Sequence, residues 1–433
     1  MKLRIAVCLL ACGLVGCEKA GTSASGPTLD DFARQYVRLA VALGERDPDA
    51  LDYYAGPPEL VADIRRNPPE LTELKRSATE LAGRLAALPG LQGDDQERRR
   101  FLLGQLTAVA ARADLLCRLK LSQAVPGFDQ EALAFFGVRL APPADAKLDS
   151  VRRELGKLLG GQGKLVDRYA AFEKKFVIPE ERMPAVMARS LELCREQTLA
   201  HVKLPAGESV RLEYVRDKPW SGYSYYQGHY HSVIEINADL GLTVDRALQL
   251  ACHEGYPGHH AFNSLAEQNL AVAKRRVEWL VQPTFSPQSF FSEASATVAG
   301  HVAFSDTERT QIEENVLFPL AGLKSADVKK YLRVEDLVDQ LHPAELAIAR
   351  DYIEGRLEFA RAATALEGEA LMSHPEATLQ YLNEYRSYVV TYTEGRDLVD
   401  QWIDGRAARS ADPSDKWKPF AKLITMPGLF SQQ

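Results

Sequence analysis

The sequence contains few cysteines and lacks the closely spaced CxxC pairs of a thiolate metal site. Six cysteines occur in 433 residues, at positions 8, 12, 17, 117, 194 and 252. The first three belong to an N-terminal segment that we expect to be cleaved or modified, so Cys117, Cys194 and Cys252 remain. One disulfide among them would suit an oxidising compartment. Three buried, unpaired thiols are the simpler interpretation and the one we expect.

The chain also lacks a concentrated basic stripe, and its 52 basic and 59 acidic residues give a net charge of −7. Proteins that bind nucleic acid carry a positive patch that neutralises phosphates, so we expect no nucleic-acid partner. Beyond the N-terminal segment, no stretch approaches the roughly eighteen apolar residues of a membrane-spanning helix. The composition predicts an ordinary globular protein behind that segment.

The N-terminal segment is typical of an exported lipoprotein. Lys2 and Arg4 precede an apolar stretch over 5–15, which has the length of a signal peptide and is too short to span a bilayer. The sequence Leu-Val-Gly-Cys at 14–17 resembles a lipobox, in which a small residue precedes the lipidated cysteine. We therefore expect a lipoprotein signal peptide over 1–16 that is removed before Cys17.

Lipidation of Cys17 would attach the protein to a membrane through a short tether. Small residues dominate 17–27, as in flexible linkers that lift a domain off a surface. Glu18 follows the cysteine, in place of the aspartate that resembles an inner-membrane retention signal. We therefore expect an outer membrane lipoprotein that faces the periplasm or the cell surface.

Residues 28–433 are predicted to form one mainly α-helical domain. Thr28 and Asp31 have the spacing of a helix-opening capping box. Between 208 and 237, alternating, aromatic and β-branched residues predict two or three strands. Long helices are expected over four stretches: 70–88, 98–121, 344–371 and 375–405. The sequence thus predicts a mainly α, multi-helix fold with one small β-sheet and a cleft between helical lobes.

Directly after the predicted strands, the sequence DRALQLACHEGYPGHHAFNSL at 245–265 contains four side chains of the metal-binding type: His253, Glu254, His259 and His260. Catalytic zinc sites use neutral imidazole and carboxylate ligands and leave one position for water. A carboxylate beside that water can act as its general base. A His-Glu pair on a helix, with another histidine on the same face, is a common way to build such a site.

The spacing differs from the HExxH pattern, because position 257 is proline and no histidine follows one turn after His253. On an undistorted helix, His260 would lie about 20° from the direction of His253, and His259 about 120° away. Pro257 and Gly258 are expected to interrupt the helix, and a local bulge would then bring His259 round instead. Spacing alone therefore leaves both histidines open as ligands.

The segment HEGYPGHH resembles the HExxPGHH signature of a broad bacterial family of uncharacterised, often lipid-anchored proteins, the domain of unknown function 885 family. That family is similar to helical zinc metallopeptidases such as the thermostable carboxypeptidases and the oligopeptidases. The resemblance implies a gluzincin-like cleft with a small sheet beside the active-site helix. It also implies one zinc ion per chain on His253, His259 and Glu293, with Glu254 as general base.

Two positions depart from the pattern of that family. Phe262 stands where the family usually has glutamine, and Ala294-Ser295 where it usually has Gly-Trp. These departures favour, slightly, a catalytically inactive lipoprotein that keeps the fold and binds a peptide or another partner. The intact His253, Glu254 and His259 oppose that alternative.

Four tyrosines near the C-terminus have spacings of four, three and four residues, and Arg396 continues their stripe: Tyr381, Tyr385, Tyr388 and Tyr392. An aromatic packing face is the simpler interpretation. In the functional interpretation, the tyrosines form one wall of the active site and Tyr392 donates a hydrogen bond to the oxyanion. Helical zinc peptidases use a C-terminal tyrosine in this way. In that hypothesis Tyr388 and Arg396 bind substrate, and Arg396 holds a substrate carboxylate.

The residues predict a zinc site, and the resemblance implies a zinc-dependent metallopeptidase, a hydrolase that cleaves peptide substrates at the periplasmic or cell-surface face. Zinc hydrolysis of a non-peptide amide or ester is an alternative that the same site would support. The second alternative is the inactive binding protein described above.

Overall fold

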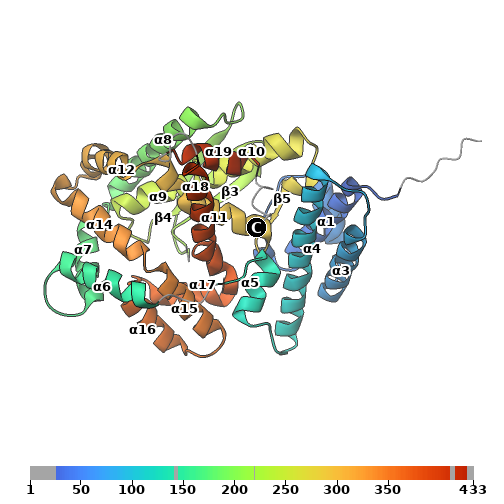
Figure 1. Cartoon of the computed structure of the whole chain (residues 1–433), viewed down its shortest axis with the longest axis horizontal. Coiled ribbons are helices and arrows are strands. Elements are labelled where there is room, and N and C mark those ends of the chain that lie inside the picture. The colour runs from blue at the N-terminus through green and yellow to red at the C-terminus, as the bar shows by residue number, and fades with distance from the viewer. Residues whose placement is uncertain (1–25, 141–144, 219, 410–414, 427–433) are drawn as a thin grey trace, which may run out of the picture.

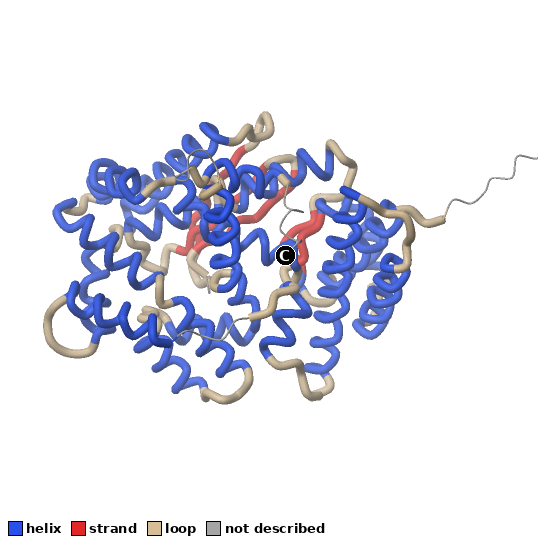
Figure 2. Tube along the Cα trace, in the orientation of Figure 1, coloured by secondary structure: helices blue, strands red, loops and turns tan. Residues whose placement is uncertain are grey.

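The computed structural model describes residues 26–140, 145–218, 220–409 and 415–426. Helices make up most of this chain, and the strands are confined to two short sheets (Figure 2). The prediction of a mainly α, multi-helix fold with a small β-sheet is confirmed. The predicted signal peptide, Cys17 and most of the tether lie outside the described residues.

The N-terminal helices form one side of the molecule, where α1, α3 and α4 pack side by side (Figure 1). The capping box at the start of α1 is confirmed, because Thr28 accepts from the Asp31 amide and the Asp31 carboxylate accepts from the Thr28 amide. The elements of this part are α1 (Leu29–Gly44), β1 (Leu51–Tyr54), α2 (Pro58–Arg66), α3 (Leu71–Ala86), α4 (Gly93–Lys120) and α5 (Phe128–Phe136).

The three-stranded sheet lies against the helix that ends in the His-Glu pair. Its order is β2-β4-β3, with β2 parallel and β3 antiparallel to the central β4. Ile234 and Ile236 of β4 are buried in the same hydrophobic cluster as Leu248 and Ala251 of α9. The elements of this region are α6 (Asp145–Leu159), α7 (Leu165–Glu173), α8 (Met183–His201), β2 (Ser209–Val215), β3 (Gly222–Gly228), β4 (His231–Asn237) and α9 (Val244–Glu254).

Helices continue to the C-terminus, and a short β5 pairs antiparallel with β1. The elements are α10 (His259–Ala266), β5 (Val281–Pro283), α11 (Pro287–Ala303), α12 (Asp306–Ile312), α13 (Phe318–Ala321), α14 (Val328–Asp339), α15 (His342–Ile353), α16 (Phe359–Glu369), α17 (Pro375–Tyr385), α18 (Glu394–Ala407) and α19 (Trp417–Thr425). No helix in the described ranges is long and apolar enough to cross a bilayer.

The long helices expected over 344–371 and 375–405 are each interrupted, so those two boundaries were wrong. Gly355 has a φ of 71° shortly after α15 ends, and Arg386 has a φ of 51° where α17 ends. Both backbones are in the left-handed region, which stops a right-handed helix. A short 3₁₀ segment, Arg386–Thr391, then leads to α18.

Helix α11 joins the two hydrophobic clusters of the molecule. Phe290 packs in the cluster built around α1, α3, α4 and α5, whereas Phe291 and Ala294 pack in the cluster around α8, α9 and α10. Its N-terminus is capped by Ser286, whose hydroxyl accepts from the Ser289 amide. The helix that carries Glu293 is thus held from both sides.

Cys194 of α8 and Cys252 of α9 form a disulfide, with their Cα atoms 5.5 Å apart. The expectation of three unpaired thiols was therefore wrong, and among the described cysteines only Cys117 is free. The sequence could not indicate the pairing, because 58 positions separate the two residues and the packing of α8 against α9 brings them together. Cys252, one of its two cysteines, directly precedes His253 in the sequence.

Candidate metal centre

The chain breaks its helix between His253 and His259. His253 and Glu254 close α9, and α10 begins at His259, after a link that contains the cis Tyr256–Pro257 bond. Gly258 lies so close to the end of α9 that a Cβ there would be 1.9 Å from the His253 carbonyl oxygen. Only glycine permits this approach, and it turns the chain so that His259 starts a helix in a new direction.

Three side chains from three helices meet at this break. Nε2 of His253 and Nε2 of His259 each lie 3.4 Å from Oε2 of Glu293. One ligand atom from each residue lies within 4.8 Å of the other two, a spacing at which a single metal ion could contact all three. The two imidazole rings are nearly perpendicular, at 84°, with centroids 4.8 Å apart. The predicted trio is thus brought together by α9, α10 and α11.

His260 points away from this group and is fully buried. Its Nδ1 lies 2.8 Å from the Ser232 hydroxyl, and its Nε2 lies 3.0 Å from Oε2 of Glu208. Arg195 and Tyr256 also donate to that carboxylate. Both ring nitrogens of His260 are therefore engaged on the side of the sheet, and they are not available to a metal at the trio. The undistorted-helix angles did not apply, because the helix is broken.

The charges of the trio depend on one another. Burial disfavours the charge of Glu293, but His259 and His253 outweigh it and hold the pKa of that carboxyl well below its usual range. Burial likewise opposes charge on His259, whereas the neighbouring Glu293 raises the pKa of its imidazole to about 9. Oε2 of Glu293 is buried and has no hydrogen-bond partner in the described part of the chain. A buried anionic oxygen therefore faces two imidazole nitrogens.

Neighbouring side chains orient the trio. Tyr388 donates to Oε1 of Glu293 over 2.9 Å, and the Ser289 hydroxyl lies 2.9 Å from the Tyr388 hydroxyl. Nδ1 of His259 lies 3.1 Å from the Ser292 hydroxyl, which leaves Nε2 toward Glu293. The Tyr388 hydroxyl thus donates to the Glu293 carboxylate, and its predicted role in binding substrate stays a prediction. Its contacts make it a support for that carboxylate.

Glu254 and Tyr392 lie beside the trio. Glu254 is buried at the end of α9 and interacts electrostatically with His259. The Tyr392 ring lies 6.3 Å from the His253 ring and 5.9 Å from the Tyr388 ring. The tyrosine stripe thus remains continuous across the break at Arg386, with the Tyr381 and Tyr385 rings stacked 4.6 Å apart. The stripe both packs in the core and reaches the candidate site.

Arg396 does not present a free guanidinium to a substrate. Both of its terminal nitrogens donate to the Asp339 carboxylate at 2.5 Å, and its side chain is only 15% exposed. A bidentate pair of this kind uses the donors that a substrate carboxylate would need. The predicted role of Arg396 in holding a substrate is therefore not supported by its contacts.

Asp52, on β1, also interacts with the trio, and the sequence did not predict it. Burial raises the pKa of its carboxyl to about 6, although the Tyr223 hydroxyl donates to it and His259 lowers the pKa. Gln282 also donates to it, over 2.8 Å. No local pattern marks this residue, since about two hundred positions separate it from the motif. Its interactions with His259 and Glu293 arise only when β1 packs near the break.

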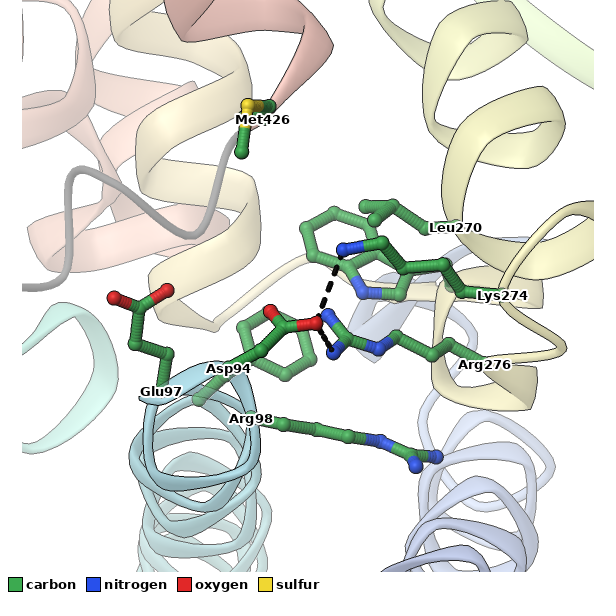
Figure 3. Close-up of a pocket in the computed structure, with 9 residues that line it drawn as sticks. Asp94, Glu97, Arg98, Leu270, Lys274, Arg276 and Met426 are labelled. Carbon is green, nitrogen blue, oxygen red and sulfur yellow. Dashed lines mark hydrogen bonds and ion pairs between the residues drawn. The ribbon is translucent and has the colours of Figure 1, made fainter. Parts of the chain in front are cut away.

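A separate cavity lies between α4 and the segment after α10 (Figure 3). Asp94 pairs there with Lys274 over 3.1 Å and with Arg276 over 2.7 Å. Trp279, Phe101 and Met426 supply its apolar lining. None of the predicted site residues lines this cavity, and Arg98 in its lining pairs with Glu278 and Asp30.

Comparison with known proteins finds a solved structure with the same fold but assigns the chain to no family. No family model matches the chain, and no curated protein does. A solved structure described as a "putative lipoprotein" from Colwellia psychrerythraea matches with a TM-score of 0.52 at 14% identity, over 93% of this chain and 74% of that one. A structure described as BsuCP matches with a TM-score of 0.36 at 11% identity, over 92% of this chain and 88% of that one. The chain therefore shares its fold with the Colwellia protein.

Proposed function

We propose that this protein is a zinc-dependent peptidase. The observation that carries the proposal is the buried Oε2 of Glu293, without a hydrogen-bond partner in the described chain and 3.4 Å from the Nε2 atoms of His253 and His259. A buried anionic oxygen without a donor is costly unless a cation or a protonated partner balances it. Two imidazoles and one carboxylate are the donor set of a catalytic zinc site.

The residues present fit zinc. His253, His259 and Glu293 would hold the ion, and Tyr388 and Ser292 would orient the carboxylate and the His259 ring from behind. Three protein ligands leave a coordination position open, as in catalytic sites and unlike closed structural ones. Zinc bound here would polarise a carbonyl group and make a water molecule more acidic.

The chain's own residues would then move the protons. Glu254, which is next to His253 in sequence and buried beside His259, would take a proton from the attacking water. The same carboxylate would pass that proton to the leaving amine as the C–N bond breaks. Tyr392 would donate a hydrogen bond to the substrate oxygen as negative charge develops on it. The products are a carboxylate and an amine.

The N-terminal segment supports an exported location for this chemistry. The lipobox-like sequence before Cys17 favours a lipid anchor, and the fold is shared with a protein described as a "putative lipoprotein". The Cys194–Cys252 disulfide suits an oxidising compartment. We therefore place the proposed activity at the outer membrane, on peptides that reach the periplasm or the cell surface.

Metal content tests the site. The protein, purified without a metal-affinity tag, is expected to bind one zinc per chain. His253→Ala, His259→Ala and Glu293→Ala should lose it. His260→Ala is the matched control, because its ring is engaged by Ser232 and Glu208, and it should keep zinc while melting at a lower temperature. No zinc in the wild type after zinc is supplied would overturn the proposal.

Peptide hydrolysis tests the activity. Glu254→Gln should bind zinc as the wild type does but cleave peptides about 10²–10⁴-fold more slowly, because a general base is lost. Equal rates in the two proteins would refute Glu254 as the base. A zinc-loaded wild type that cleaves esters and non-peptide amides but no peptide would favour the alternative hydrolase.

A further inference from the structure

The chain turns sharply at Arg386, between α17 and the segment that carries Tyr388. Arg386 has a φ of 51° and a ψ of −116°. These angles are close to about 60° and −120°, which the first central residue of a type II′ turn adopts. Glycine is usual at that position, because a residue with a Cβ is strained there. Arginine therefore needs an interaction that holds it in this conformation.

Glu131 of α5 supplies that interaction. Its Oε2 accepts from Nε of Arg386 over 2.7 Å. Its Oε1 accepts from the amide of Ser387 over 3.1 Å and from the hydroxyl of the same residue over 2.8 Å. The Glu131 side chain is 1% exposed, so water does not compete for these bonds. One buried carboxylate thus holds two consecutive residues of the turn.

Tyr388 follows the turn directly, and its position depends on it. The Tyr388 hydroxyl donates to Oε1 of Glu293 over 2.9 Å. The Tyr388 ring lies 5.9 Å from the ring of Phe136, which belongs to α5 like Glu131. Because residues 386 and 387 connect Tyr388 to the end of α17, their backbone angles set the direction of its side chain. Helix α5 therefore contacts both the turn and the tyrosine that orients Glu293.

A buried ion pair that only stabilises the fold is the simpler interpretation of these contacts. Arg98 and Glu278 form such a pair, with a carboxylate that is 0% exposed and hydrogen bonds of 2.6 and 2.9 Å. Within the described ranges, neither residue of that pair has a hydrogen bond to the trio or to Tyr388. Glu131 differs, because the residue two positions after its arginine is the tyrosine that donates to Glu293.

We propose that Glu131 is a positioning residue for the candidate metal centre: it fixes the turn at Arg386 and thereby directs the Tyr388 hydroxyl to Glu293. The inference rests on the proposed zinc site and adds a residue on which the affinity of that site for zinc depends. Glu131 belongs to the N-terminal helices, so the proposal makes the packing of α5 against the segment Arg386–Thr391 a condition for tight metal binding.

Zinc affinity, measured by competition with a chelator in a double-mutant cycle, tests the inference. Glu131→Gln keeps an oxygen that can accept from Ser387 but removes the charge that Arg386 needs, and it should weaken zinc binding by about tenfold. In Tyr388→Phe, adding Glu131→Gln should change the affinity by less than about twofold, because the hydroxyl that Glu131 positions is already missing. Losses that multiply would show a general effect on the fold and overturn the proposal.

A rescue variant covers the case in which Glu131→Gln does not fold. Arg386→Gly removes the guanidinium that needs a carboxylate, and glycine adopts the angles of this turn without strain. Glu131→Gln combined with Arg386→Gly should therefore bind zinc within about threefold of the wild type. A folded double variant that binds zinc as weakly as Tyr388→Phe would overturn the proposal. Failure of both variants to fold would also overturn it, because Glu131 would then serve the fold as a whole.

Glu278→Gln is the matched control, because it removes a carboxylate that is as buried and as closely paired with an arginine. It should lower the melting temperature and leave the zinc affinity within about twofold of the wild type. Equal losses of affinity in Glu278→Gln and Glu131→Gln would overturn the role of Glu131. If the wild type binds no zinc, the proposed function fails together with this inference. If the wild type binds zinc and the losses multiply, only the role of Glu131 fails.

Discussion

Tyr388 donates a hydrogen bond to Oε1 of Glu293 over 2.9 Å, which leaves Oε2 of the same carboxylate toward the imidazoles of His253 and His259. The tyrosine comes from the segment between α17 and α18, about 95 positions after the carboxylate that it orients. Because this hydrogen bond already orients the carboxylate, the side chain would lose less conformational entropy when a metal binds.

Tyr388→Phe should therefore weaken zinc binding by about 10–100-fold while the fold is kept. The ring would still pack against Phe136 and Phe285, so only the hydroxyl is lost. Competition with a chromophoric chelator measures the affinity. Tyr385→Phe is the control, because its ring belongs to the same stripe and its hydroxyl has no described bond to Glu293. Equal affinities of the two variants would contradict the supporting role.

Loss of the Cys194–Cys252 disulfide should lower the free energy of unfolding by about 4 kcal/mol, since it closes a loop of 58 residues. Urea denaturation of the Cys194→Ser, Cys252→Ser double variant, and of the wild type with and without reductant, measures the change. Cys117→Ser should have a small effect, because that thiol is unpaired and partly exposed. Identical midpoints for wild type and double variant would show that the bond does not contribute to stability.

Gly258→Ala should disturb the candidate metal centre and destabilise the protein. The new Cβ would lie 1.9 Å from the His253 carbonyl oxygen and 2.5 Å from that of Cys252, and backbone atoms cannot rotate away. We expect a loss of more than about 2 kcal/mol and weaker zinc binding, because His259 must shift. Calorimetric melting and metal titration check both effects.

The matched control for Gly258→Ala is Gly83→Ala. Gly83 lies in α3, and a Cβ there meets no atom within 4 Å. Alanine in a helix interior should stabilise the protein by about 0.5–1 kcal/mol. If Gly258→Ala kept the stability and zinc affinity of Gly83→Ala, the close approach at Gly258 would not determine the position of His259.

Glu335 should make the protein less stable as the pH rises. Burial, and then the charge of Asp245, raise the pKa of this carboxyl to about 8. Between about pH 4.5 and 8 the folded state holds a proton that the unfolded chain has released. Stability therefore falls by about 1.4 kcal/mol per pH unit through this group. Glu335→Gln should remove that slope, so its gain over the wild type grows from pH 5 to pH 8.

Denaturation curves at several pH values test the role of Glu335. The Glu313 carboxyl is also buried and its pKa is raised, in part by the charge of Glu335. The difference between wild type and Glu335→Gln therefore contains the titration of Glu335 and its effect on the pKa of Glu313. Parallel stability profiles for the two proteins would refute the buried, protonated state of Glu335.

Much of the fold could be predicted because its signals are local. The capping box at Thr28, the helical spacing in α3 and α4 and the alternation in β2 each involve neighbours within a few residues. The predictions of single helices over 344–371 and 375–405 were wrong, because Gly355 and Arg386 have positive φ angles that end the helices. Arg386 gives no such signal in sequence, because arginine is a good helix former.

The sequence by itself determined the mainly helical class, the strands before the motif and the presence of His253, Glu254 and a histidine pair at one chain segment. It did not decide between His259 and His260, because the angle between residues is known only on an unbroken helix. The tertiary structure brings His259, and not His260, next to His253 and Glu293, through the close approach at Gly258 and the engagement of His260 by Glu208. It also decided that Tyr388 supports Glu293, that Arg396 is taken by Asp339 and that Cys194 pairs with Cys252. Each of these is a contact between residues distant in sequence, and only the packing of whole helices brings such groups within reach.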